Sequence, residues 1–308
     1  MPSVWPYGLD GLRDVAPVSL VDLSAPGRLA RFRSRLGIGP RPRAGLAFTW
    51  DENAAFRLQV GHPHERFVSG VIWLTDMVER GTVPGRLVDV LRRAEALWVL
   101  SEAQVEPLRR VLGADGPRVV AVPFGVDAEF FSPRPFPDRP RVVSIGNDRD
   151  RDPQTLFRAL ARVREARPEA EIIVQTSAAE APDGIEIVQR MSHRDLRELY
   201  ETASVVATAT RSNLHVSGMT VTLEALATGR PVVNTGTPGM SQYVAEGRTG
   251  HLVPVGDAEA MADRLISLLD DPTRAAAMGA AGRRVVEEGF TTQVMCAHLG
   301  AILSPTAG

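Results

Sequence analysis

The stretch from Ser204 to Asn234 restricts the fold of this chain more than any other. It consists of a strand of small and β-branched residues, a polar loop containing Gly218, an apolar helix that ends near Gly229, and a short strand from Pro231. Glycine is typical of a helix end, and proline of a position that stops a helix. Strand, loop, helix and strand predict a parallel α/β unit, in which ligands bind at the carboxyl ends of the strands. The unpaired N–H groups at the start of the helix predict an anion there.

Apolar runs that alternate with helical patterns fill both sides of a proline-rich segment, residues 123–140, which we interpret as an interdomain linker. The predicted strands are Val18–Leu23, Leu46–Thr49, Phe67–Leu74, Ala96–Leu100 and Arg118–Val122 before it, and Arg141–Gly146, Glu171–Thr176, Ile185–Val188, Ser204–Thr210, Pro231–Asn234 and His251–Val253 after it. An Arg-rich helix is predicted from Pro26 to Leu36, and Ser101 with Gln104 has the spacing of a capping box. We expect two Rossmann-like, doubly wound domains that enclose a cleft, residues 1–135 and 136–308, with the last helix able to pack back on the first.

The composition argues against several classes of protein. The formal net charge is −2 and the pI is about 6.3, so no nucleic-acid partner is expected. All 35 basic side chains are arginines, whose forked donors suit phosphate. The single cysteine, Cys296, excludes an internal disulfide, and the sequence shows neither a membrane span nor a signal peptide. A soluble, cytoplasmic protein is the expectation.

Several segments in order resemble a known family. These are LRRAEALWVLSEAQVEPLRR and VVAVPFGVDAEFF before the linker's end, then VVSIGNDRDRDPQTLFRAL, MSHRDLRELYETASVVATAT, VSGMTVTLEALATGRPVV and TPGMSQYVAEGRTGHLVPVGD. They are similar to motifs of the retaining, nucleotide-sugar-dependent glycosyltransferases that include sucrose and glycogen synthases. The resemblance covers about two-thirds of the chain. It implies the GT-B fold, with a short N-terminal domain because residues 1–90 match only loosely.

The resemblance assigns the donor site to the second domain. Glu224 matches an acid that accepts hydrogen bonds from the donor ribose, a role that suits an acceptor-only carboxylate. Ser217, Gly218, Met219 and Thr220 match a loop whose amides meet the sugar and the distal phosphate. Arg190 and Met191 match a segment whose backbone meets the base. Ser192, which follows them, is also a natural helix N-cap.

Two arginines are expected to grip the diphosphate. The family has an arginine directly after the glycine that corresponds to Gly146, and a lysine a few residues later. Arg151 matches the lysine, while Asn147 replaces the arginine and Arg149 is placed to cover its role. An arginine fork binds two phosphate oxygens and offsets the charge of a leaving group. Asp148 and Asp150 have a D-x-D spacing, but the resemblance implies that no metal or other cofactor is required.

Val216 is the main departure from the family pattern. It lies eight positions before Glu224, where the resemblance predicts an acid that contacts the donor sugar. Valine can neither accept a hydrogen bond nor stabilise positive charge. Either neighbouring His215 or the loop backbone takes over part of that role, or the protein binds donor and catalyses poorly. His215 is therefore a candidate catalytic residue, although an ordinary loop histidine is nearly as good an interpretation.

Candidates in the first domain carry less weight. The resemblance implies a histidine from this domain at the cleft, and His62, His64 and Asp76 are the candidates for the acceptor side. The two histidines also fit a solvated loop. Trp50, Asp51 and Trp73 lie near predicted strand ends, where a core role is expected for the tryptophans.

The combined prediction is a hexosyltransferase-type glycosyltransferase. It would move a sugar from a nucleotide diphosphate sugar to an acceptor hydroxyl, with retention at the anomeric carbon as the resemblance implies. The alternative is a non-catalytic nucleotide-sugar binder or accessory protein of the same fold, which Val216 motivates. A sugar-nucleotide epimerase on this fold matches the motifs less well. The base, the sugar and the acceptor, whether small molecule, glycan or lipid, stay open.

Overall fold

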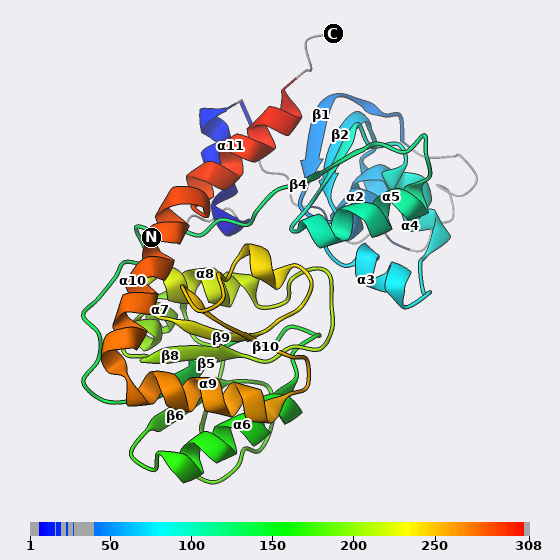
Figure 1. Ribbon diagram of the computed structural model, residues 1–308. Helices are drawn as coiled ribbons and strands as arrows, with labels where there is room; N and C mark the ends of the chain where they lie inside the picture. Colours follow the sequence, from blue (N-terminus) through cyan, green and yellow to red (C-terminus); the bar gives the residue numbers. More distant parts are fainter. Residues whose placement is uncertain (1–5, 16, 20–22, 24–26, 28–39, 305–308) are drawn as a thin grey trace. The chain divides into compact units, whose positions relative to one another are not determined.

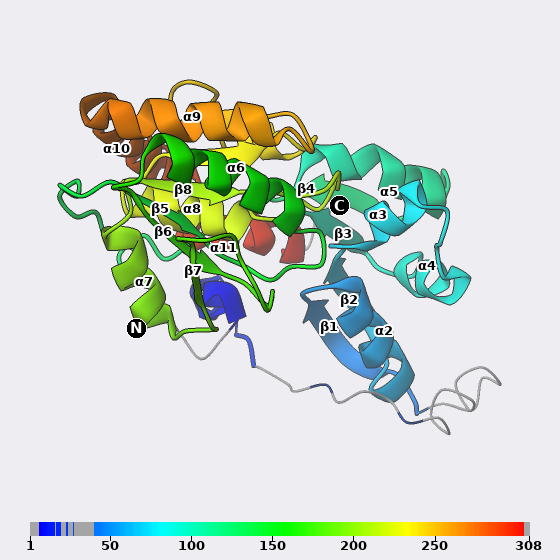
Figure 2. The same ribbon diagram turned by 90° about the horizontal axis from the view of Figure 1, so that it is seen from below.

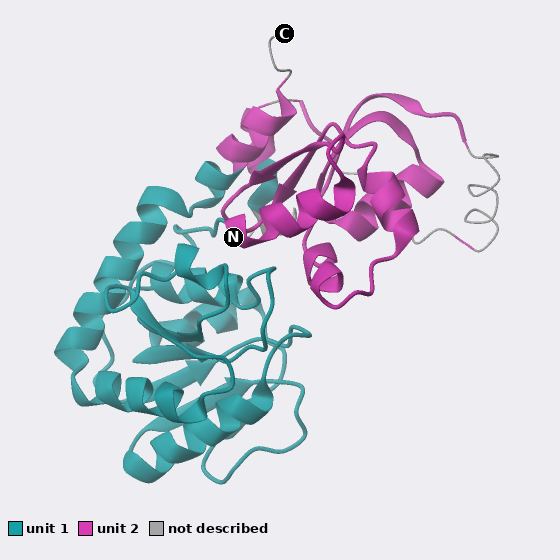
Figure 3. Ribbon diagram, turned by 45° about the vertical axis from the view of Figure 1, so that its right-hand side comes forward, with its two compact units in different colours: residues 1–10, 124–295 teal, residues 11–123, 296–308 magenta. Residues whose placement is uncertain are grey.

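The computed structural model describes residues 6–15, 17–19, 23, 27 and 40–304 of the chain. The chain divides into two compact units (Figure 3), one of Met1–Asp10 with Phe124–Met295 and one of Gly11–Pro123 with Cys296–Gly308. The division at Pro123 comes earlier than the predicted one at residue 135. The predicted strand at 18–23 and the Arg-rich helix at 26–36 lie largely outside the described residues.

The unit that holds Gly11–Pro123 contains a parallel four-stranded sheet in the order β1-β2-β3-β4. Its strands are β1 (Arg43–Thr49), β2 (His64–Gly70), β3 (Ala96–Val99) and β4 (Arg118–Ala121). They confirm all four apolar runs predicted after residue 40, but β2 ends at Gly70 and the rest of that run enters a loop and helix. The described helical elements of this part of the chain are η1 (Pro6–Asp14), α2 (Glu52–Gly61), α3 (Leu74–Glu79), α4 (Gly85–Leu91), η2 (Glu102–Gln104) and α5 (Val105–Leu112).

Two helix starts in this unit differ from the predictions. Asp51 is the N-cap of α2 and accepts from the N–H groups of Asn53 and Ala54. The capping box predicted at Ser101 is wrong, because Ser101 makes no side-chain capping bond and Gln104 accepts from the N–H of Leu100 instead. Trp50 stacks edge to face on buried Trp98, but Trp50 and Trp73 are themselves only partly buried, so the core role expected for these two tryptophans is not confirmed.

The larger unit has a parallel six-stranded sheet in the order β10-β9-β8-β5-β6-β7. Its strands are β5 (Arg141–Ser144), β6 (Glu171–Gln175), β7 (Glu186–Val188), β8 (Val205–Thr208), β9 (Val232–Thr235) and β10 (Gly250–Val253). Within this sheet, the chain first forms β5, continues outward through β6 and β7, and then forms β8 on the other side of β5. The order therefore reverses between β5 and β8, which is the topological switch point where doubly wound sheets bind ligands.

Helices cover both faces of this sheet. The helical elements of this unit are α6 (Pro153–Ala166), α7 (His193–Glu201), α8 (Met219–Ala227), η3 (Met240–Gln242), α9 (Ala258–Asp270) and α10 (Pro272–Gly289). The last helix, α11 (Thr292–Leu303), begins in this unit, and from Cys296 onward it belongs to the smaller unit. In Figures 1 and 2, α6 and α9 lie on one face and α8 on the other. Leu160, Val205 and Leu265 belong to the core between the sheet and helices α6 and α9. The sequence predicts a helix from Met240 to Glu246, but the structure has only the 3-10 turn η3 at Met240–Gln242.

The predicted linker is an ordered part of the larger unit from Phe124 onward. The N–H of Phe124 donates to the Tyr243 hydroxyl at 3.0 Å. Arg283 Nη1 donates to the carbonyls of Ala128, Phe131 and Ala227, each at 2.8 Å, and Arg230 Nη2 reaches the carbonyl of Pro135 at 2.9 Å. The prediction that this segment forms no helix is confirmed. Side chains distant in sequence donate to its backbone carbonyls and fix its conformation.

Candidate functional site

The loops that follow β5 and β8 lie side by side at the switch point. The N–H of Asp152 donates to the carbonyl of Ala209 at 3.0 Å, and the N–H of Arg211 donates to the carbonyl of Asp150 at 2.8 Å. A cleft of about 300 Å³ opens there, between these loops and the carboxyl end of β6. Its lining includes Gly146, Asp148, Arg149, Arg151, Thr176 and Arg211. The strand-loop-helix pattern predicts a ligand beside the loop after β8, and none of the residues 217–220 of that loop lines this cleft.

The Arg151 guanidinium packs between two glycines. A Cβ on Gly146 would lie 2.3 Å from its Nη2, and a Cβ on Gly218 would lie 3.0 Å from its Nη1. Both glycines have positive φ, +116° and +93°, which other residues rarely adopt. Nε of Arg151 is buried and makes no hydrogen bond among the described residues. Burial lowers the pKa of this guanidinium, and the nearby charge of Asp148 opposes the shift. A buried cation with an N–H that lacks an acceptor among the described residues is prepared for an anion.

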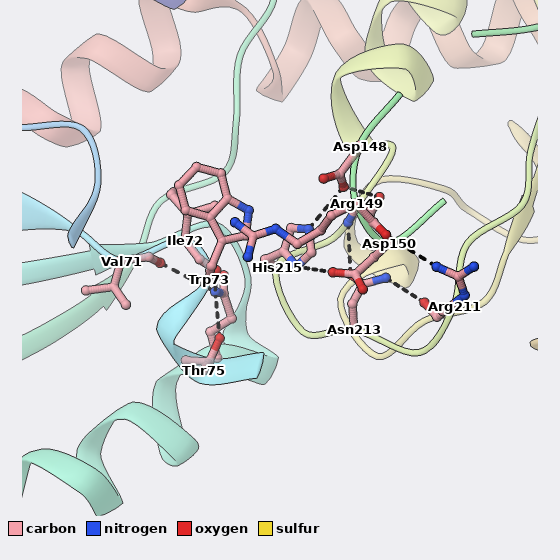
Figure 4. Close-up of polar contacts among 12 residues, drawn as sticks. Val71, Ile72, Trp73, Thr75, Asp148, Arg149, Asp150, Arg211, Asn213 and His215 are labelled. Atoms are coloured by element: carbon pink, nitrogen blue, oxygen red, sulfur yellow. Dashed lines mark hydrogen bonds and ion pairs between the residues drawn. The ribbon is translucent and has the colours of Figure 1, made fainter. Parts of the chain in front are cut away.

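Asp148 connects the two loops through one of its carboxylate oxygens. His215 Nε2 lies 3.2 Å from Asp148 Oδ2, and Ser217 Oγ donates to the same oxygen, as Figure 4 shows for the histidine. His215 is buried, and its Nδ1 lies 3.9 Å from Oδ2 of Asp150. Partial burial raises the pKa of Asp148, but the bonds from His215 and Ser217, with the charge of Arg151, bring it well below its ordinary value. Asp148 is therefore ionised throughout the neutral range.

The loop before α8 is held in a strained shape. Asn213 donates to the carbonyl of Arg211 at 2.8 Å and accepts from the N–H of Ser217 at 2.9 Å. Val216 has a φ of 56°, and no other non-glycine residue among those described has a positive φ. A β-branched residue in this region is a genuine outlier, and such residues persist only where their surroundings impose the conformation. Val216 is also buried, so its side chain cannot face a ligand.

The loop amides expected to meet the sugar and phosphate fall into two groups. The N–H of Ser217 donates to Asn213, and the N–H of Met219 donates to the carbonyl of Val216 at 3.0 Å. The N–H groups of Gly218 and Thr220 make no hydrogen bond to any described residue. Gly218 is the N-cap of α8, so these two amides belong to the start of that helix. They remain the better candidates for an anion.

Glu224 lies in the interior of α8 and not in its first turn. It is 7% exposed, and the Tyr200 hydroxyl donates to its Oε2 at 2.8 Å. Burial raises the pKa of Glu224 to about 7, against the opposing effect of the Tyr200 bond. Burial and the charge of Glu224 raise the pKa of Tyr200, and the nearby charge of Arg151 opposes this shift. Glu224 does not line the cleft described above, and its ribose role stays a prediction.

The remaining predicted donor residues lie at different places. Arg149 is exposed and lines the cleft. Arg190 is exposed and Met191 partly buried in the segment after β7, the edge strand, and neither lines that cleft. Ser192 forms a complete capping box with Asp195 at the start of α7, which confirms its interpretation as an N-cap.

The candidates in the smaller unit occupy opposite ends of its sheet. His62 is exposed after α2, and His64 opens β2, with its Nδ1 2.9 Å from the carbonyl of His62. That is the amino end of a parallel sheet, away from the end where such sheets bind ligands, which argues against an acceptor role. Asp76 is buried in α3, which follows the carboxyl end of β2. Asp76 is thus the better placed of the three.

Two buried polar residues of this unit were missed by the sequence analysis. Both carboxylate oxygens of Glu52 accept backbone bonds, from Ile72 at 2.8 Å and Trp73 at 2.9 Å. Gln104 donates to the carbonyl of Ile72 at 2.9 Å and to the Thr75 hydroxyl at 3.0 Å. Together they fix the loop between β2 and α3. Glutamate next to the N-cap Asp51 looks like an ordinary first-turn acid, so the sequence carried no signal of this role.

Two further features bear on the predictions. No group of three or more metal-ligating side chains suited to a metal ion is found within the described parts of the chain. Asp148 and Asp150 instead contact His215. No helix in the described residues is long and apolar enough to cross a membrane.

Comparison with known sequences gives consistent relatives. Residues 139–271 match the family described as Glycosyl transferases group 1. A GDP-mannose-dependent monoacylated alpha-(1-6)-phosphatidylinositol monomannoside mannosyltransferase of Corynebacterium glutamicum is 29% identical over 81% of this chain and 74% of its own length. A D-inositol 3-phosphate glycosyltransferase of Kribbella flavida is 29% identical over 64% of this chain, and a phosphatidylinositol monomannoside mannosyltransferase of Mycolicibacterium smegmatis is 30% identical over 63%. The chain spans only 54% and 59% of the last two relatives.

Solved structures give the architecture. The sucrose-phosphate synthase of Thermosynechococcus elongatus matches 89% of this chain and 75% of its own, with a TM-score of 0.66 and 19% identity. Anabaena HepE in complex with UDP-glucose matches 82% of this chain and 76% of its own, with a TM-score of 0.65 and 15% identity. At such identities the likeness shows the fold. Residues 139–271 therefore carry a glycosyl transferases group 1 segment, and the chain has the GT-B fold with two Rossmann-like domains.

Proposed function

We propose that this protein transfers a hexose from a nucleoside diphosphate sugar to a hydroxyl of its acceptor, with retention at the anomeric carbon and without a metal. The observation that carries the proposal is the Arg151 guanidinium, held between Gly146 and Gly218 at the switch point with a buried Nε that lacks a partner among the described residues. A diphosphate in the cleft would accept from this fork and from the amides of Gly218 and Thr220. As the bond to the sugar breaks, the same donors would stabilise the departing diphosphate.

The relatives suggest which substrates to test first. Two of them are named as GDP-mannose-dependent enzymes that act on phosphatidylinositol monomannosides, and another as a glycosyltransferase of D-inositol 3-phosphate. All three names contain an inositol-bearing acceptor. We propose an acceptor of this class, bound at the carboxyl edge of the four-stranded sheet, where Asp76 lies.

The test is a matrix of donors and acceptors. GDP-mannose, UDP-glucose and other nucleotide sugars are incubated with inositol phosphates and phosphatidylinositol monomannosides, and products are identified by mass spectrometry. Nuclear magnetic resonance of the product then reports whether the anomeric configuration is retained. A protein that binds no nucleotide sugar would contradict the proposal.

Arg151→Ala tests the assigned chemistry directly. We expect it to weaken nucleoside diphosphate binding about 10- to 150-fold, the value of one charged hydrogen-bond pair, and to leave nucleoside binding unchanged. Arg158→Ala removes an exposed arginine from α6 and is the matched control. Equal losses for nucleoside and diphosphate would exclude a phosphate role for Arg151.

Val216 supports a second candidate function, a nucleotide-sugar binder that does not transfer. The expected acid is replaced by an apolar side chain that points away from solvent. This candidate predicts tight donor binding with no nucleoside diphosphate release across the whole acceptor matrix. Release that depends on an acceptor would exclude it.

A further inference from the structure

We propose that Asp148, fixed in place by His215 and Ser217, binds a hydroxyl of the donor sugar and so supplies the carboxylate that the chain lacks at Val216. The inference rests on the proposed function, because it assumes a nucleotide sugar in the cleft after β5. It assigns a substrate-binding role to Asp148 and positioning roles to His215 and Ser217.

The geometry leaves half of the carboxylate available. Both contacts, from His215 Nε2 and Ser217 Oγ, converge on Oδ2 of Asp148. Oδ1 makes no hydrogen bond to a described residue. The side chain is 32% exposed and lines the cleft. Two donors on one oxygen fix the plane of the carboxylate, and the other oxygen is free to accept from a ligand.

The charge of Asp148 indicates which part of a ligand it meets. Asp148 and Arg151 are close enough for each charge to shift the pKa of the other. A phosphate beside Asp148 would be repelled, whereas a sugar hydroxyl can donate to it. The diphosphate therefore belongs on the Arg151 side, and the hydroxyl-rich sugar on the Asp148 side. A fixed negative charge would also favour positive charge that develops on the sugar during transfer.

The loop around Val216 explains why the carboxylate comes from a different strand. The two residues that flank Val216 are His215 and Ser217, and both contact Asp148. Val216 itself is buried with a left-handed backbone, which turns its side chain inward. An acid with the backbone and burial of Val216 would be withdrawn from solvent. The loop thus directs His215 and Ser217, the neighbours of Val216, toward Asp148. The carboxylate at this point of the cleft is that of Asp148, from the loop after β5.

Asp148→Asn tests the inference with little change in shape. The variant and wild type are titrated calorimetrically with a nucleoside diphosphate, with the matching nucleotide sugar, and with a series of singly deoxygenated donors. Asp183→Asn, which removes an exposed carboxylate outside the cleft lining, is the control. His215→Gln keeps the Asp148 carboxylate but removes its imidazole support, so it separates binding from positioning.

The expected pattern is specific to a sugar contact. In Asp148→Asn, affinity for the nucleoside diphosphate is unchanged or several-fold tighter, because a like charge has been removed. Affinity for the nucleotide sugar falls about tenfold or more, as expected for a lost charged hydrogen bond. One deoxy donor binds wild type and variant equally and thereby identifies the hydroxyl. The His215→Gln variant should prefer the intact donor over this deoxy donor by a smaller factor than the wild type does.

Two results would overturn the inference. One is an equal loss of affinity for the diphosphate and the nucleotide sugar, which would mean a structural role. The other is a variant that discriminates every deoxy donor as wild type does. Failure of the proposed function has a different signature, because wild type would then bind neither diphosphate nor nucleotide sugar.

Discussion

Replacing Gly146 with alanine should separate the position of the Arg151 guanidinium from its presence. An added Cβ would lie 2.3 Å from Nη2, 2.9 Å from Cζ and 3.0 Å from Nε of Arg151. These atoms form the far end of a flexible side chain, so the clash is relieved when the guanidinium moves out of its place. The backbone cannot adapt as easily, because the φ of +116° is one that alanine rarely adopts.

The two effects have different magnitudes and different readouts. Holding alanine at this φ costs about 1–3 kcal/mol in the free energy of unfolding. Displacing Arg151 removes its contact with a diphosphate, which is worth about 1.5–3 kcal/mol. The Kd for a nucleoside diphosphate should therefore rise about 10- to 150-fold. Binding of the nucleoside alone should stay the same.

Gly256→Ala provides the matched control. Gly256 has a φ of +79°, and an added Cβ there would meet no atom within 4 Å. This variant carries the backbone strain without disturbing Arg151. Urea denaturation measures the strain in both variants, and calorimetry measures the affinity for diphosphate and nucleoside. If the two variants bind the diphosphate equally well, the position of Arg151 between the glycines has no role in binding.

Three further changes test other parts of the larger unit. The pKa of Glu224 is raised to about 7 from an ordinary value of 4.5, so the folded protein holds this proton more tightly than the unfolded chain does. Relative to Glu224→Gln, the free energy of unfolding of the wild type should therefore fall by about 3 kcal/mol between pH 4.5 and 7. Urea denaturation measures this at each pH, and the same pH dependence of the free energy of unfolding in both proteins would contradict it. Arg283→Ala should cost about 2–4 kcal/mol and expose residues 124–140 to proteolysis, because three carbonyls lose their donor, while exposed Arg284→Ala should change stability by less than about 0.5 kcal/mol. Arg151→Met should raise the stability of the ligand-free protein by about 1 kcal/mol and abolish its stabilisation by nucleoside diphosphate in a thermal shift assay.

The fold was predictable where local pattern decides the structure. Strands β8 and β9 are short runs buried on both faces, and Ser192, a predicted N-cap, marks the start of a helix that the structure confirms. The errors follow one rule. Where tertiary hydrogen bonds decide the structure, as in residues 124–140 and after Met240, the sequence near the segment does not contain its partners.

The site was predictable as a location and less so as a set of contacts. The pattern around Gly218 predicts a loop between a strand and a helix, which the structure has, because a strand end and a helix start are local features. The contact between Asp148 and His215 joins residues that are 67 positions apart, and Tyr200 lies 24 positions before Glu224. Spacing on a helix or strand cannot reveal such pairs. Asp148 was read only as half of a D-x-D pattern, although its partners are a histidine and a serine of the other loop.

The loops after β5 and β8, together with helix α8, hold several groups that destabilise the ligand-free protein. Val216 is in a strained conformation, Nε of Arg151 is buried without a partner among the described residues, and burial of Glu224 disfavours its charged form. Costs of about 1–3 kcal/mol each are a large part of the net stability of a domain, about 5–15 kcal/mol. A ligand that bonds to Arg151 would offset part of this cost, and its binding would therefore stabilise the fold. The unit must tolerate this cost without a ligand. Two of its arginines stabilise it through bonds to the backbone. Arg230, through Nε and Nη2, and Arg283, through Nη1, each donate to three backbone carbonyls, and neither lines the cleft. Arginine thus serves two purposes in this unit: Arg151 keeps a buried Nε without a hydrogen-bond partner among the described residues, which suits it to bind a ligand, and Arg230 and Arg283 stabilise the fold.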